Sequence, residues 1–438
     1  MTTRRPDRGA RRVQGTYYAL TLGNTLAASF IWGINTLFLL DAGLSNLEAF
    51  AANAFFTAGM VIFEIPTGVI ADTVGRRASY LLGTVTLAGT TALYWMLWLW
   101  QAPFWAWALV SVLLGLGFTF FSGAVDAWLV DALRFTEYRG SLETVFGRAQ
   151  VVGGVAMLSG SVAGGVLAQA TDLGVPFLVR AGILLVMIVV AGALMRDLGF
   201  EPVRGLSPLA ATRQVMRSSV TYGLGRPAIR WFMIATPFTA GVGVYAFYAL
   251  QPYLLELGGD EGAYALAGLA AAIISGASIL GGALAPLARR LFRRRTTLLL
   301  LSVAVSALVL VGFGLTQNLV AAIGLLPLWG ISSSIATPAS RAYLNDMIPS
   351  AQRATVLSFN SLVGNIGGVG IQPALGRVAD VSGYGASLLW GGVISTLALP
   401  FLLASRSRRD PADHAVDDAA PPVVRLDDGM PDPSSPIR

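Results

Sequence analysis

Residues 68–77 read GVIADTVGRR and stand between two long apolar runs. The run before them is AFAANAFFTAGMVIFEIPT (49–67), and the run after them is ASYLLGTVTLAGTTALYWMLWLW (78–100). One carboxylate, two arginines and two glycines at such a place need a structural or functional reason. That reason depends on the character of the whole chain.

The composition indicates an integral membrane protein. Hydrophobic residues make up 55% of the chain and charged residues 12%, whereas a soluble domain carries about 25% charge. About 20 consecutive apolar residues cross the hydrocarbon core as a helix, and a barrel would instead show short alternating segments. Twelve apolar segments reach this length, namely 17–40, 49–71, 79–100, 104–130, 144–170, 176–195, 231–255, 263–286, 297–316, 319–344, 354–379 and 385–404.

The basic residues predict how these spans are oriented. All 30 are arginines, and most of them lie in the N-terminal tail, in alternate loops and after the last span. The loops near 41–48, 101–103, 171–175, 256–262 and 317–318 hold none. By the positive-inside rule we expect both termini in the cytoplasm and the protein in the cell membrane. The net charge of +6 thus reflects topology, and we expect no nucleic-acid partner.

The residues that the chain lacks exclude several chemistries. It contains no cysteine and no lysine, and its one histidine, His414, lies in the polar tail. A Walker A loop needs lysine and a Schiff-base enzyme needs an amine, while a buried triad or a His-based metal site needs histidine. We therefore expect no enzyme activity, no cofactor and no metal site, and any work must draw on a gradient or a partner protein.

Polar segments divide the chain into five parts. We expect a cytoplasmic N-terminal tail (1–16), a six-helix bundle (17–195), a cytoplasmic linker (196–230), a second six-helix bundle (231–404) and a disordered cytoplasmic tail (405–438). Within the linker, the stretch SPLAATRQVMRSSV predicts an amphipathic helix that rests on the membrane surface.

The two halves look like repeats. Residues 144–174 align without gaps on 355–385, an offset of 355 − 144 = 211, which pairs Gly165 with Gly376. Duplicated six-helix halves are typical of secondary transporters, in which the binding site lies between the halves near mid-membrane.

The quoted stretch resembles the loop between helices two and three of the major facilitator superfamily, whose pattern is G-x-x-x-D-x-x-G-R-R. The matching residues are Gly68, Asp72, Gly75, Arg76 and Arg77. The basic residue that often follows the aspartate is replaced here by Thr73. With twelve spans and duplicated halves, the resemblance covers about residues 15–404. It implies an all-α integral membrane fold of two pseudo-symmetric six-helix bundles.

The loop residues suggest a cytoplasmic gate. Gly68 would let helix two approach a neighbour closely, and Gly75 can adopt the positive φ that a short reversal needs. Asp72, at the membrane edge, needs a positive partner. The resemblance suggests that this partner is the start of helix eleven near Arg353, which would form a latch. A loop that serves topology alone is the alternative.

A second, weaker motif lies in helix five. Residues 160–165, GSVAGG, resemble the G-P-x-x-G-G element of drug/proton antiporters with Ser161 in place of proline. Gly160, Gly164 and Gly165 would permit close helix packing, which is the alternative interpretation. The arginine that such antiporters carry in helix four is absent.

Ionisable residues within spans are candidates for function, because their burial is costly. We select Asp126, Glu64 and Arg341 for proton coupling; Arg148 and Arg180 complete the set. Residues 126–133 align on 341–348, so we expect Asp126 and Arg341 to face each other across the central cavity. A structural ion pair is the alternative.

Polar and aromatic stripes at helical spacing predict the wall of that cavity. Such stripes also serve hydrogen bonding between helices, which is the alternative interpretation. The candidates are Asn24, Trp32, Asn35, Tyr245, Tyr248 and Thr337, with Ser333, Ser361, Asn365 and Gln372 on the same faces.

We interpret the chain as a monomeric secondary transporter that works by alternating access. The hypothesis is proton-coupled efflux of small hydrophobic or cationic compounds, with the lipid bilayer, a small-molecule substrate and protons as its partners. Uptake or uniport of a metabolite is the first alternative, and a transporter-like sensor or scaffold is the second.

Overall fold

The computed structural model describes residues 8–202, 225–348 and 353–414, which are almost entirely helical. The first half contains α1 (Arg8–Trp32), α2 (Asn35–Asp41), α3 (Asn46–Thr73), α4 (Arg76–Leu99), α5 (Phe104–Thr119), α6 (Ala124–Phe135), α7 (Leu142–Ala170) and α8 (Val175–Leu194). The second half contains α10 (Pro227–Gly258), α11 (Tyr264–Leu291), α12 (Arg295–Leu315), α13 (Leu319–Ser334), α14 (Thr337–Met347), α15 (Arg353–Thr396), α16 (Ala398–Ser407) and the 3₁₀ helix η2 (Pro411–Asp413).

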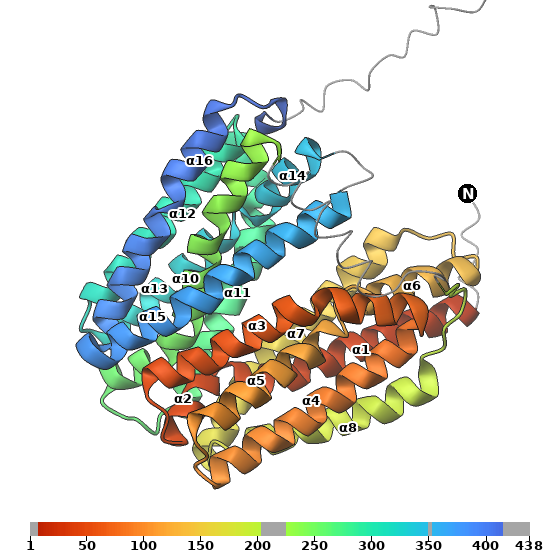
Figure 1. The fold of residues 1–438 in the computed structure, drawn as a ribbon, viewed down its shortest axis with the longest axis horizontal. Helices are drawn as coiled ribbons and strands as arrows, with labels where there is room; N and C mark the ends of the chain where they lie inside the picture. Colours follow the sequence, from red (N-terminus) through yellow and green to blue (C-terminus); the bar gives the residue numbers. More distant parts are fainter. Residues whose placement is uncertain (1–7, 203–224, 349–352, 415–438) are drawn as a thin grey trace, which may run out of the picture.

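The described helices supply twelve spans. Ten stretches are long and apolar enough to cross a membrane, and α1 with α2, bent by 47°, makes an eleventh. One of the ten, Val356–Ser407, has 52 residues and as one helix would be about 78 Å long, against about 30 Å of hydrocarbon. Gly383, with φ +81° and ψ 168°, breaks it, and the chain reverses there (Figure 1). The stretch Val356–Ser407 therefore makes two spans, which brings the total among the described residues to twelve. The predicted fold class, an all-α integral membrane protein of two six-helix bundles, is confirmed.

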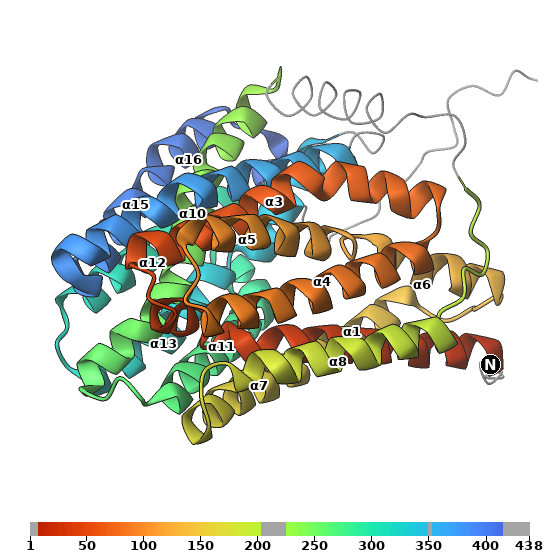
Figure 2. The same cartoon turned by 60° about the horizontal axis from the view of Figure 1, so that its bottom comes forward.

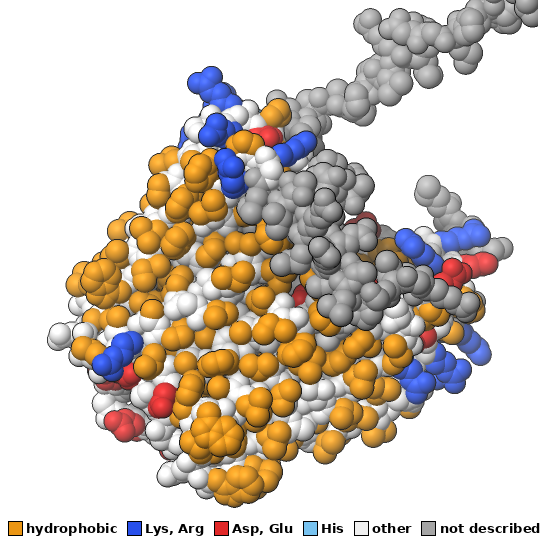
Figure 3. All heavy atoms as spheres, viewed as in Figure 1, with side chains coloured by type: hydrophobic (Ala, Val, Ile, Leu, Met, Phe, Trp, Pro, Cys, Tyr) orange, Lys and Arg blue, Asp and Glu red, His pale blue; other side chains and the backbone are white. Residues whose placement is uncertain are grey.

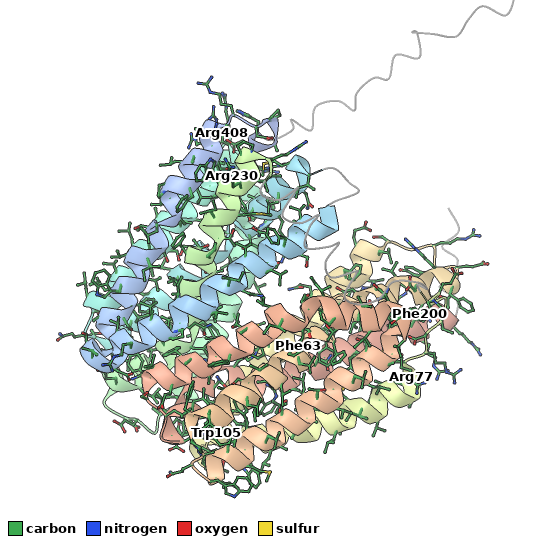
Figure 4. The ribbon with its side chains drawn as sticks, in the orientation of Figure 1. Phe63, Arg77, Trp105, Phe200, Arg230 and Arg408 are labelled. Carbon is green, nitrogen blue, oxygen red and sulfur yellow. The ribbon has the colours of Figure 1, made fainter. Side chains whose placement is uncertain are left out.

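The helices form two bundles, α1–α8 and α10–α16, that meet at one end and diverge at the other (Figures 1 and 2). They meet mainly through α3 against α15 and α7 against α11. Figure 4 places Arg77 on one diverging arm and Arg230 and Arg408 on the other. We call this the arginine-rich end. The end where the bundles meet, which includes Trp105, is called the closed end.

The flanks of the molecule are apolar. In Figure 3 hydrophobic side chains cover the sides of both bundles, whereas charged side chains gather at the ends. Val189 of α8 and Leu308 of α12 each lie in mid-helix and are 70% exposed. Side chains of this type at such exposure are suited to lipid rather than to water.

Two predicted spans contain breaks that position polar side chains. The segment predicted as 104–130 is divided into α5 and α6 at Gly123, whose φ of +67° is left-handed. The segment 319–344 is divided into α13 and α14 next to Ala336. Each break brings a polar residue, Ser122 in the first and Thr337 in the second, toward the space between the bundles.

The domain boundaries differ from those predicted. Helix α1 begins at Arg8, so residues 8–16 belong to the first helix and not to a separate tail. The tail predicted from residue 405 starts later in the structure, since α16 extends to Ser407 and Pro411–Asp413 form η2. The linker helix predicted near 207–220 and the tail beyond 414 lie outside the described residues.

Asp413 explains why the chain after α16 is ordered. It is 1% exposed, and its carboxylate accepts hydrogen bonds from the Thr296 backbone N–H at 2.8 Å and hydroxyl at 2.9 Å. These donors begin α12, where unpaired N–H groups favour a negative charge. Arg295 also donates to the carbonyl oxygen of Ala412 at 2.9 Å. The segment therefore closes the end of the second bundle.

We expect truncation to matter on one side of this cap only. A chain ending at residue 414 should keep the wild-type unfolding temperature, whereas one ending at 409 should lose about 1–3 kcal/mol of stability, since Thr296 then lacks its acceptor. Thermal unfolding in detergent measures both. Equal unfolding temperatures for the two truncated chains would contradict the proposed cap.

Candidate functional site

A cavity of about 850 Å³ lies between the bundles. From the first bundle it is lined by Met60, Glu64, Phe118 and Ser122. The second bundle contributes a longer, polar wall from α10 and α12 to α16, which includes Thr236, Thr239, Ser302, Ser333, Thr337, Ser340, Arg341, Asn345, Ser358, Asn360, Ser361 and Asn365. Most of the hydrogen-bonding groups of the lining thus come from the second bundle, which also contributes apolar side chains, and the carboxylate comes from the first.

Glu64 is the one acidic residue among the described residues that line this cavity. It lies on α3, and its Oε1 accepts a hydrogen bond at 2.5 Å from the hydroxyl of Ser122, in the turn between α5 and α6. Arg341, on α14, is the one basic residue of the same lining. A negative and a positive charge therefore reach the cavity from different bundles.

Asp126 lies away from the lining. It is exposed on the first turn of α6, and its Oδ1 accepts a hydrogen bond at 2.7 Å from the hydroxyl of Tyr17 on α1. The two ion pairs that described residues form, Asp72 with Arg76 and Asp346 with Arg295, do not include it. The expected juxtaposition of Asp126 with Arg341 across the cavity is therefore not seen in this conformation.

Most of the other wall candidates hold helices together. Tyr80 donates to Asn24 Oδ1 at 2.8 Å, and Asn35 donates to Asn53 Oδ1 at 3.0 Å. Gln251 donates to the carbonyl oxygen of Trp32 at 2.6 Å.

The hydroxyl of Tyr245 donates to Ser387 Oγ at 2.6 Å, and Gln372 donates to the carbonyl oxygen of Gly368 at 3.0 Å. Tyr248 is absent from the lining. The predicted residues that do line the cavity are Thr337, Ser333, Ser361 and Asn365.

The loop motif is tied to its own bundle. Asp72 pairs with Arg76, and Gly75 has the expected positive φ, +129°. Asp197, which follows α8, accepts the backbone N–H of Arg77 at 2.9 Å and so caps α4.

Gly68 and Arg353 are the other two residues of the predicted gate. A Cβ at Gly68 would meet no heavy atom within 4 Å, so no close neighbour requires this glycine in the present conformation. The side chain of Arg353, the predicted partner of Asp72, lies outside the described part of the chain.

At the closed end, a carboxylate links the two bundles. Asp380, near the outer end of the first segment of α15, accepts the backbone N–H of Asn46 at 2.8 Å and of Leu47 at 2.9 Å. These two N–H groups begin α3 in the other bundle. A carboxylate is favourable there, because the first N–H groups of a helix lack intrahelical acceptors. Tyr384 also donates to the side chain of Asn46.

A second link has the same design. Gln169, at the end of α7, accepts the backbone N–H of Ala265 in the first turn of α11 at 3.0 Å. At the offset of 211 that aligns the repeats, Gln169 falls on Asp380 (169 + 211 = 380). We call the contact of Asp380 with α3 and of Gln169 with α11 the two caps of the closed end. Sequence reasoning missed both, although the repeat alignment contained the pair.

Glycines allow the helices to come this close. A Cβ at Gly165 would lie 2.6 Å from the carbonyl oxygen of Tyr264, and one at Gly376 would lie 2.8 Å from that of Asn46. Both are contacts between bundles. Gly160 and Gly164 instead face α1, with a Cβ at Gly164 only 1.9 Å from the carbonyl oxygen of Phe30.

Comparison with known proteins identifies the fold. The family model described as Major Facilitator Superfamily matches residues 17–371, and no curated protein matches the chain. The nucleoside transporter NupG superposes with a TM-score of 0.75 at 11% identity, covering 91% of this chain and 99% of its own.

A bacterial homologue of the human lysosomal transporter Spinster, inward-facing and occupied, gives 0.71 at 15% identity, with 94% and 99% covered. A peptide transporter, POT, in complex with sulfate gives 0.70 at 13% identity, with 92% and 96% covered. At these identities the likeness concerns the fold alone.

The packing role of helix five can be tested at Gly164. We expect Gly164→Ala to lower stability by about 1–3 kcal/mol, because its Cβ meets a backbone carbonyl that a rotamer change cannot relieve. Gly182→Ala on α8 is the matched control, since its Cβ meets no heavy atom within 4 Å. Thermal unfolding in detergent compares them, and equal unfolding temperatures would show that the close approach is not limiting.

Proposed function

This chain belongs to the major facilitator superfamily, and we propose that it is a proton-coupled secondary transporter that exports small hydrophobic or cationic compounds by alternating access. The observation that carries the proposal is the cavity between the bundles, whose lining holds one carboxylate, Glu64, beside Met60 and Phe118. Each chain contains both bundles, so the proposed working unit is a monomer.

The orientation follows from the arginines. Loops at the arginine-rich end carry most of the positive charge, so the positive-inside rule assigns this end, with both termini, to the cytoplasm of a cell membrane. The diverging arms then open the cavity inward, and the two caps close the outside. An exporter in this state would load its substrate from the cytoplasm or from the inner leaflet.

Glu64 is better placed than Asp126 to link protons with substrate. A cationic substrate and a proton would compete for its carboxylate, because both bind to the same two oxygen atoms. Ser122, in the turn between α5 and α6, holds this carboxylate in place, because its hydroxyl donates to Glu64 Oε1. Competition at one carboxylate is sufficient for exchange of a proton against a cation.

Helices α3 and α15 provide the proposed switch between the two conformations. The segment of α15 before Gly383 runs antiparallel to α3, and its end at Asp380 lies against the start of α3. Asp380 caps α3 at the closed end. By the family resemblance, Asp72 near the other end of α3 would cap the start of α15 when the arginine-rich end closes. In the present state Asp72 is held by Arg76. Closing one end would then release the cap of the other.

The polar wall favours a second candidate, uptake of a metabolite. Arg341, Asn360 and Asn365 offer the hydrogen bonds that a polar solute requires. Such a carrier would move its solute without discharging a proton gradient.

A sensor or scaffold is the third candidate. For such a protein, loss of residues 415–438 or of the linker would abolish function, whereas a transporter would keep its activity without the tail.

Proton coupling is tested in everted vesicles with a pH-sensitive dye. After energisation we expect a lipophilic cation such as tetraphenylphosphonium to release protons from vesicles that hold the wild type. Glu64→Gln should abolish the release, because its amide cannot exchange a proton, while Asp126→Asn should retain it. Silence of the wild type across a cation panel would favour metabolite transport. Release by Glu64→Gln would remove this residue from the coupling.

The cap at Asp380 is tested by labelling, since the chain contains no native cysteine. A cysteine introduced at cavity residue Ser358 should react with an impermeant maleimide from the arginine-rich side. Adding Asp380→Ala should shift labelling toward the opposite side by about 2- to 30-fold, the equivalent of a cap worth about 0.5–2 kcal/mol.

The matched control for this shift is Asp172→Ala. Asp172 also caps a helix at the closed end, but it does so within its own bundle, where it accepts the N–H groups of Gly174 at 2.8 Å and Val175 at 3.0 Å. We expect this variant to leave the labelling ratio unchanged. An equal ratio in wild type and Asp380→Ala would rule out the cap as an element of the switch.

A further inference from the structure

The guanidinium of Arg180 lies inside the first bundle. Arg180 stands on α8, a membrane span, and is 2% exposed. A charge at such a position is costly unless an opposite charge or a full set of hydrogen-bond acceptors replaces the lost water. Arg180 is therefore expected to have strong partners.

The described part of the chain supplies only weak ones. Arg180 Nε donates to the hydroxyl of Thr91 at 3.1 Å, and neither ion pair among the described residues includes it. Its two Nη atoms donate to no acceptor among residues 8–202, 225–348 and 353–414. Four N–H donors of this cation thus have no acceptor in the described part of the chain.

The unpaired donors lie directly behind the cavity wall. Arg180 Cζ is 5.8 Å from the ring centre of Phe118, which lines the cavity. The charge of Arg180 acts on Tyr248, which belongs to α10 of the other bundle, and no hydrogen bond joins the Tyr248 hydroxyl to a described residue. The hydroxyl of Tyr94, also nearby, is already paired with Ser111 at 2.5 Å. One donor group from each bundle therefore remains available at this place.

We propose that Arg180 and the hydroxyl of Tyr248 form a subsite for an acidic group of the substrate. The subsite rests on the proposed transport function and narrows its substrate class. Phe118 lies in the last turn of α5, on the closed-end side of Ser122, the partner of Glu64. The acidic group would lie at the deeper level, and a hydrophobic or cationic remainder would lie beside Glu64. The substrate would then be a hydrophobic or cationic compound that also carries an acidic group.

Charge and geometry give the subsite its selectivity. A guanidinium can donate two parallel hydrogen bonds to a carboxylate, and such charge-assisted bonds are stronger than bonds to a neutral amide. Exclusion of water strengthens the difference, because the dielectric constant around the pair is low. An acid should therefore bind more tightly than its amide, which has the same shape and no charge.

The test compares 2-naphthoate with 2-naphthamide by calorimetric titration of the purified full-length protein in detergent. We expect the wild type to bind the acid about tenfold more tightly than the amide. Arg180→Gln should abolish this preference. Arg148→Gln is the matched control, because Arg148 is an exposed arginine of the same bundle outside the cavity lining, and it should keep the preference.

Tyr248→Phe provides a second variant should Arg180→Gln fail to fold. It removes one hydroxyl without changing packing, and we expect it to weaken naphthoate binding about threefold and to leave naphthamide binding unchanged. Equal affinity of the wild type for acid and amide, or no binding of either, would overturn the subsite. Retention of the acid preference in a folded Arg180→Gln protein, or unchanged naphthoate binding in Tyr248→Phe, would overturn it as well.

This measurement is independent of proton coupling, since equilibrium binding in detergent needs no gradient. A preference for the acid together with silence in the vesicle assay would keep the subsite and remove proton-coupled export. Proton release by cations without any acid preference would do the reverse. Glu64→Gln should keep the acid preference, because Glu64 lies at the other level of the cavity.

Discussion

The first N–H groups of two helices, α3 and α11, link the bundles of this molecule at the closed end. Two caps at the closed end place an acceptor from one bundle, Asp380 or Gln169, on the N-terminus of a helix in the other. Because these donors have no intrahelical partner, each cap satisfies groups that would otherwise need water. The cap is local, so it holds the closed end without fixing the arms at the arginine-rich end.

Duplication of the sequence explains why there are two caps and why they differ. The offset of 211 that pairs Gly165 with Gly376 also pairs Gln169 with Asp380, and each glycine lets its helix approach the helix that is capped. A second pair follows the same logic within each bundle. Asp197 caps α4 and Asp413 caps α12, in both cases through the second residue of the capped helix.

Hydrophobic length and arginine placement predicted the fold from the sequence, because both depend only on the bilayer as solvent. The repeat and the loop motif located the bundles, and the positive φ of Gly75 followed from its place in a short turn. Contacts between residues far apart in the chain were not predictable in this way. Asp413 looked like part of a polar tail, since no local pattern shows that Thr296 needs an acceptor.

The candidate site was predictable only in part, because the residues of one helix do not show which neighbours that helix packs against. Spacing on one helix identified Thr337 and Arg341, which do line the cavity. It also selected Asn24 and Tyr245, whose polar atoms bond to neighbouring helices instead. A polar stripe states that a helix needs partners, but the packing of the other helices decides whether these partners are protein or solute. Arg180 appeared only as one charge among several until its lack of acceptors was seen.

The strength of the caps is suited to a reversible switch. A single cap contributes about 0.5–2 kcal/mol, which changes a population ratio by about 2- to 30-fold. A much stronger link, such as a large apolar interface, would leave the other conformation too rare for turnover. Asp380 caps α3 from the side that faces water, so its carboxylate is resolvated when the helices part, and this lowers the cost of opening. Weak and exposed caps at the closed end therefore allow this end to open at a small cost in free energy.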